Sequence, residues 1–89
     1  MIPHRRNMHA YQRRAVAKVE AAIPSSGFRP ETEAEWERLQ EASVELAAAG
    51  HRASGATKAQ AWRVARATMG SPAGRAVLEI CFKDDSNDQ

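Results

Sequence analysis

Apolar residues recur every three or four positions along four segments of this chain, which is the spacing of an α-helix. The clearest segment is residues 57–69, where a buried face is predicted opposite a basic face. Its apolar arc is Ala61, Trp62, Val64, Ala65 and Met69, and its polar arc is Gln60, Arg63 and Arg66. Thr57 is a capping residue type and Gly70 a terminating one, so the helix is predicted to lie between them.

A second helix is predicted over residues 7–23. Its shared apolar face is Met8, Tyr11, Ala15, Val19, Ala22 and Ile23. Asn7 is the predicted cap. Pro24 disfavours helix in the residue before it, so this helix is expected to end near Ala22.

A third helix is predicted over residues 31–49, after a short connection. Thr32 followed by Glu35 matches a capping box, and Gly50 is the predicted terminator. The inward face is predicted to be Trp36, Leu39, Ser43, Leu46 and Ala47.

The last apolar segment, residues 72–83, has two interpretations. Ser71 followed by Pro72 is typical of a helix start, with Ala73, Ala76, Val77 and Ile80 on one face. A buried strand over residues 76–82 is the alternative, because short apolar runs suit both structures. Helix is preferred, since no partner strand is evident.

These segments predict an all-α fold, a small bundle of about four helices in a single domain of 89 residues. The first two long helices are expected to pack as an antiparallel pair, and the last two to close over them through Trp62, Trp36 and Tyr11. Residues 1–6 are a basic lead-in and residues 84–89 a frayed acidic tail. Large apolar residues are few, so the core is expected to be thin.

Composition excludes several classes of protein. Thirteen Lys and Arg stand against eleven Asp and Glu, a net charge of +2 that does not by itself indicate nucleic acid. Cys81 is the only cysteine, which excludes an intramolecular disulfide and fits a small core residue. No apolar run is long enough for a bilayer or for a signal peptide, so we expect no membrane association and a cytoplasmic location.

No catalytic or metal site is predicted. His4 and His9 lie five residues apart, not at the spacing that puts two ligands on one helix face. Cys81 lies in an apolar run, where a thiol has little nucleophilic character. The serines lie in turns, where capping explains them. We therefore expect a protein that is not an enzyme and uses no cofactor.

Charged residues supply the candidate contact surfaces. Glu37, Glu41 and Glu45 are four residues apart and stack along one helix face, which suits contact with a basic partner. The basic residues are Arg5, Arg6, Arg13, Arg14 and Lys18 near the N-terminus, and Arg52, Lys58, Arg63 and Arg66 around residues 57–69. If the first and third helices in chain order expose them on one side, they would form a positive surface for an acidic partner or for phosphates, with Arg13, Arg14, Arg63 and Arg66 as the leading candidates.

Residues 57–80 resemble short helical accessory proteins of tailed phages and prophages. The shared pattern is a Thr-Lys/Arg-x-Gln-Ala-aromatic helix, then a glycine-containing turn and another helix. The matching residues are Thr57, Lys58, Gln60, Ala61, Trp62 and Gly70. The resemblance covers about the last third of the chain and transfers no functional residues. It implies a phage or prophage origin, where small proteins often bind and block a host protein.

Three hypotheses for function follow. The leading one is a protein-binding inhibitor or regulator that occludes a surface of a host complex, such as a defence system. The alternative is a nucleic-acid-binding regulatory protein that uses the basic faces of the first and third helices. A third is a structural subunit that forms a homodimer through Leu78 and Phe82.

Overall fold

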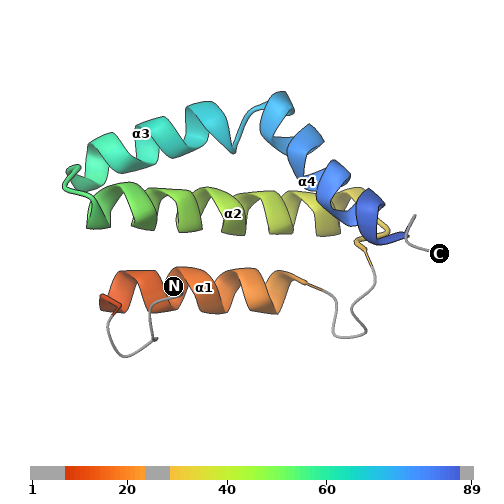
Figure 1. The fold of residues 1–89 in the computed structure, drawn as a ribbon, viewed down its shortest axis with the longest axis horizontal. Helices are drawn as coiled ribbons and strands as arrows, with labels where there is room; N and C mark the ends of the chain where they lie inside the picture. Colours follow the sequence, from red (N-terminus) through yellow and green to blue (C-terminus); the bar gives the residue numbers. More distant parts are fainter. Residues whose placement is uncertain (1–7, 24–28, 87–89) are drawn as a thin grey trace.

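The computed structural model describes residues 8–23 and 29–86, and the side chains of the second range as far as Cys81. Its helices are α1 (Ala10–Ala22), α2 (Glu33–Ala53), α3 (Lys58–Thr68) and α4 (Pro72–Ser86). This confirms the all-α, four-helix class, and it settles the last apolar segment as helix. α2 lies between α1 and α3 and runs antiparallel to both, while α4 turns away from the end of α3 (Figure 1).

The predicted helix starts at Thr32, Thr57 and Pro72 are confirmed by hydrogen bonds. The backbone N–H of Glu35 donates to Thr32 Oγ1 at 3.2 Å. The N–H of Gln60 donates to Thr57 Oγ1 at 3.1 Å. In α4, Ser71 Oγ accepts from the N–H of Gly74 at 3.1 Å. Each side chain satisfies a backbone donor that the first helical turn leaves unpaired.

The predicted end of the first helix near Ala22 is also confirmed, but two other predicted ends differ from the structure. The N-cap of α1 is His9, paired reciprocally with Gln12, whereas Asn7 lies outside the described residues. α2 continues through Gly50 to Ala53. A glycine ends a helix when its backbone turns left-handed, and the described residue that does so is Gly55, with a φ of 116°.

Part of the predicted acidic tail differs from expectation. Residues 84–86, predicted as part of a frayed tail, belong to α4. Residues 1–6, the predicted basic lead-in, and residues 87–89 lie outside the described part of the chain.

Two small hydrophobic clusters share α2 as their common wall. One joins Ala22 of α1 to Trp36, Leu39 and Ala42 of α2, with Leu78 of α4 packed against it. The other joins Val44 and Ala48 of α2 to Ala61 and Ala65 of α3, with Trp62 and Met69 against it. The predicted thin core is thus divided between the two ends of α2.

Several residues predicted to face the core are exposed instead. These are Leu46, Val64, Val77, Ile80 and Cys81. Ile23 is also exposed, at the margin. The last two helices were expected to close over the first two through Trp62, Trp36 and Tyr11. This is also wrong, because Trp36 and Trp62 belong to different clusters. α1 and α3 each pack on α2 rather than closing over one another.

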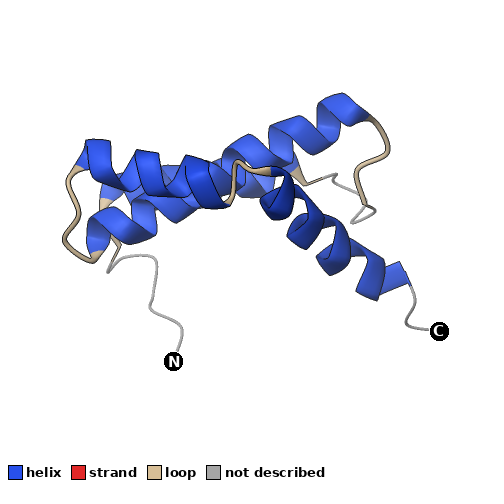
Figure 2. Ribbon diagram, turned by 90° about the horizontal axis from the view of Figure 1, so that it is seen from above, coloured by secondary structure: helices blue, strands red, loops and turns tan. Residues whose placement is uncertain are grey.

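The turn between α3 and α4 is fixed to α2 by one amide. Gln40 Nε2 donates to the carbonyl of Met69 at 2.8 Å and to that of Ser71 at 3.0 Å. Gly74 is buried here, and a Cβ at this position would collide with the backbone of Met69. The turn therefore sets the direction in which α4 leaves the other helices (Figure 2).

Ala65→Leu should destabilise the fold, because Ala65 is fully buried where α3 meets α2. Overpacking this contact is expected to lower the free energy of unfolding by about 1–3 kcal/mol. Ala67→Leu, on the exposed side of the same helix, should change it by less than about 0.5 kcal/mol. Urea unfolding followed by circular dichroism makes the comparison. Equal midpoints for the two variants would contradict the packing described here.

Candidate functional site

The predicted acidic and basic sets do not form two opposite faces. Lys18 Nζ lies 2.8 Å from Glu45 Oε1, and Arg66 Nη2 lies 3.0 Å from Glu41 Oε1. Two of the three stacked carboxylates are therefore in ion pairs with α1 and α3. Glu37 is exposed and makes no ion pair with the residues that the structure describes.

The four predicted arginines have different surroundings. Arg14 lines a hollow between helices, and Arg66 is paired with Glu41. Arg13 and Arg63 are exposed and do not line that hollow. Of these four residues, Arg14 alone lines the hollow.

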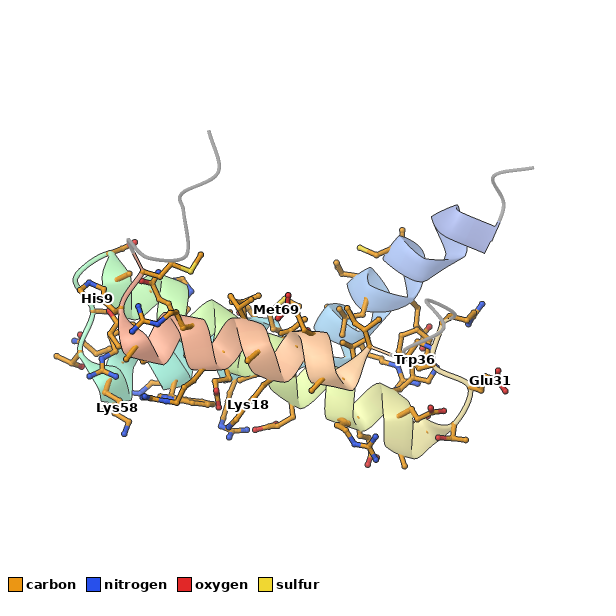
Figure 3. The ribbon with its side chains drawn as sticks, turned by 90° about the horizontal axis from the view of Figure 1, so that it is seen from below. His9, Lys18, Glu31, Trp36, Lys58 and Met69 are labelled. Atoms are coloured by element: carbon orange, nitrogen blue, oxygen red, sulfur yellow. The ribbon has the colours of Figure 1, made fainter. Side chains whose placement is uncertain are left out.

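The hollow lies between α1 and α3, above the second half of α2, and has a volume of about 180 Å³. Its walls are Tyr11, Arg14 and Lys18 on one side and Lys58, Ala61 and Trp62 on the other, and its floor is Glu45, Ala48, Ala49 and Arg52. It exists because both outer helices pack on α2 and the intervening floor carries short side chains. Figure 3 shows Lys18 and Lys58 along one edge of the molecule.

Four cations and one carboxylate line this hollow. The carboxylate, Glu45, is held by Lys18. The guanidinium carbon of Arg52 lies 4.2 Å from the ring centre of Tyr11, whose ring also stacks on His9 at 5.1 Å. Arg14, Arg52 and Lys58 make no ion pair among the described residues, so the hollow carries unbalanced positive charge. The sequence indicated Arg52 and Lys58, together with Arg14 and Lys18, as parts of one possible positive surface, and these four line the hollow. The hollow itself could not be predicted, because the helix pairing that forms it is not a local property.

The outer face of α4 is the second candidate surface. Leu78, predicted at a self-association surface, instead packs against the Trp36 and Leu39 cluster. Phe82, predicted beside it, has a side chain outside the described set. Val77 and Ile80 are 52% and 56% exposed. The signal that could have identified the inner face is Gly74 and Leu78, four residues apart, since a buried glycine marks close approach.

Arg75 holds α4 to the start of α2. Its Nη1 and Nη2 lie 2.7 Å and 3.0 Å from the two carboxylate oxygens of Glu33, and its Nε lies 2.9 Å from Glu79. The guanidinium carbon is 4.9 Å from the ring centre of Trp36. A planar fork paired with a carboxylate while stacked on an aromatic ring has little freedom to rotate. The inner face of α4 is thus anchored, and its apolar outer face stays turned to solvent.

Two carboxyl groups near this contact have altered acidity. Hydrogen bonds from the Arg75 guanidinium hold the pKa of Glu33 below its ordinary value of 4.5. The backbone N–H groups of Glu31 and Thr32 donate to Glu35 and lower its pKa in the same way. In both cases the bonds favour the ionised carboxylate.

Other kinds of site find no support in the described part of the chain. It contains no group of His, Cys, Asp and Glu side chains that could hold a metal ion. None of its helices has the length and apolar character needed to cross a bilayer.

Comparison of the chain with protein-family models, curated proteins and solved structures found no match in any of the three. What the molecule does must therefore be inferred from the hollow and from α4.

The lowered pKa values of Glu33 and Glu35 predict how stability depends on pH. Because the folded-state pKa lies below the unfolded one, these groups stabilise the fold above about pH 4.5 and lose that effect as pH falls through the folded value. The double variant Glu33→Gln/Glu35→Gln should be less stable at neutral pH and show a shallower loss of stability on acidification.

Thermal unfolding between neutral and acidic pH provides the measurement, with Glu37→Gln as the control on the same helix. If both proteins lose stability with the same slope on acidification, the two hydrogen-bonded carboxylates do not act as described.

Proposed function

We propose that this protein is a non-enzymatic binding module that covers a surface of another protein, with the outer face of α4 as the contact. The observation that carries the proposal is the exposure of Val77 and Ile80 on a helix whose opposite face is anchored by Arg75 and Leu78. Large apolar side chains three residues apart on a fixed helix suit insertion into a groove of a partner.

The small residues beside these anchors favour the same mode of contact. Ala73 and Ala76 are exposed on α4, so a partner can approach the helix backbone closely along this stripe. Val77 and Ile80 are already about half buried, so covering the rest of these two side chains contributes about 1.5–3 kcal/mol. Micromolar affinity requires about 8 kcal/mol. The contact must therefore extend beyond Val77 and Ile80. An interface that occludes a surface of the partner is much larger than these two residues and can supply the remaining binding free energy.

The proposed setting is a phage or prophage protein that inhibits a host complex such as a defence system. The resemblance of residues 57–80 to short helical accessory proteins of tailed phages supports it. Inhibition by occlusion requires an exposed binding face and no catalytic group, and α4 supplies such a face.

The test is the double variant Val77→Lys/Ile80→Lys. It should reduce capture of the partner from a bacterial host lysate at least tenfold, because each lysine places a charge in an apolar contact. Val64→Lys is the matched control: Val64 is 44% exposed, but it lies on α3. Both variants should keep the stability of the parent protein to within about 0.5 kcal/mol.

Three outcomes would contradict the proposal: equal capture by both variants, equal loss in both, or no captured protein at all.

Light scattering tests the alternative that the α4 face binds a second copy of this chain. A parent protein that is dimeric, and becomes monomeric in Val77→Lys/Ile80→Lys alone, would show that the α4 face binds a second copy of this chain.

A further inference from the structure

The hollow between α1 and α3 gathers more cations than its single carboxylate balances. Arg14, Lys18, Arg52 and Lys58 line it together, and only Lys18 has a carboxylate partner among the described residues. Like charges held close together repel, so this arrangement costs folding free energy. Residues that are unfavourable for the fold and share one concave site indicate a ligand of opposite charge.

Lys58 strengthens this inference. It is the first residue of α3, where the helix dipole is positive and a cation is disfavoured, and the first turn contains no acidic residue. The unpaired backbone N–H groups of that turn add to the positive potential at the hollow. An anion bound here would be stabilised by both Lys58 and the helix end.

Arg52 is already oriented for such a ligand. Its guanidinium lies over the ring of Tyr11 at 4.2 Å, which restricts its motion and leaves the N–H groups at its edge able to donate. Those donors match the oxygens of a phosphate in a two-point contact. With Arg14 and Lys58 across the hollow, a phosphate would meet cations from all three helices.

Trp62 indicates which class of anion the hollow binds. Its half-buried ring lines the same hollow, with Arg66 lying 5.3 Å from the ring centre. A phosphate accompanied by a planar base uses both the cations and the indole, whereas an acidic peptide uses only the cations. Stacking on an aromatic ring beside a positive groove is how single-stranded nucleic acids are bound without sequence preference.

The size of the hollow fits this ligand. Its volume of about 180 Å³ equals roughly six water molecules at about 30 Å³ each, room for a phosphate with part of its nucleoside. The bases of a duplex are stacked and paired with one another, so they are not free to lie against Trp62, whereas those of a single strand are. We propose that this hollow binds the phosphodiester backbone of a single-stranded nucleic acid, with Arg14, Arg52 and Lys58 on the phosphate and Trp62 against a base.

The test uses short fluorescently labelled oligo-dT and oligo-U, with binding followed by anisotropy over a range of salt concentrations. The parent protein should bind both strands. Arg52→Gln/Lys58→Gln should bind at least tenfold more weakly, and the slope of log affinity against log salt should fall by about 1.4, since each lost phosphate contact removes about 0.7.

Arg13→Gln/Arg63→Gln is the control, because it removes the same net charge from exposed positions outside the hollow. It should retain most of the affinity. Tryptophan fluorescence should be quenched on binding in the parent protein, and the quenching should be lost in Trp62→Phe. Arg52→Gln/Lys58→Gln should unfold at the same urea concentration as the parent protein or a higher one, which separates loss of binding from loss of fold.

Equal weakening in the two double variants would reduce the effect to bulk charge and overturn the proposal. Equal affinity for duplex DNA, or displacement of the oligonucleotide by poly-glutamate or by inorganic phosphate alone at similar concentrations, would overturn it in favour of another ligand. None of these substitutions lies on α4, so the result is independent of the test of Val77 and Ile80.

Discussion

Close approach of three helices to α2 is the constraint on which the rest of this fold depends. α1, α3 and α4 all contact α2, and the buried positions at these contacts are mostly alanines, such as Ala15, Ala48 and Ala65. An alanine removes little apolar area from water, so stability here comes from many short contacts along a long helix. Larger anchors, Trp36, Leu39 and Val44, are confined to α2 itself. The outer helices therefore depend on α2 more than on one another.

This dependence explains both surface features. Because α1 and α3 are held by α2 and not by each other, a hollow remains between them over the short side chains of Ala48 and Ala49. Because α4 touches α2 only through its inner face, its outer apolar residues stay exposed. The hollow and the apolar stripe thus follow from one packing scheme. The outer helices α1, α3 and α4 each pack on α2, and their other faces stay uncovered.

Local chemistry made the helices predictable, and the expected antiparallel pairing of α1 with α2 is confirmed, whereas the placement of α3 and α4 was not predicted correctly. Thr32, Thr57 and Ser71 bond to backbone N–H groups within their own first turns, so a few adjacent residues sufficed to predict those starts. The buried face of α4 was predicted wrongly because alanines and aliphatic residues occur all round it, so no single arc stands out. Arg52 and Lys58 were grouped with Arg14 by charge alone, but the hollow that they line could not be predicted, since it is formed by the packing of α1 and α3 on α2.

The ion pairs across α2 also shape the charge of the molecule more than its stability. Arg66 with Glu41 is an exposed pair, a class that contributes about 0–1 kcal/mol, and Lys18 with Glu45 is exposed on the lysine side but mostly buried at the carboxylate. Their larger effect is to neutralise the carboxylates nearest the hollow. The remaining cations there face no compensating acid among the described residues, and a concave site concentrates their field. A protein with a net charge of only +2 can in this way present a strongly positive site, because its acids are paired where they would otherwise cancel it.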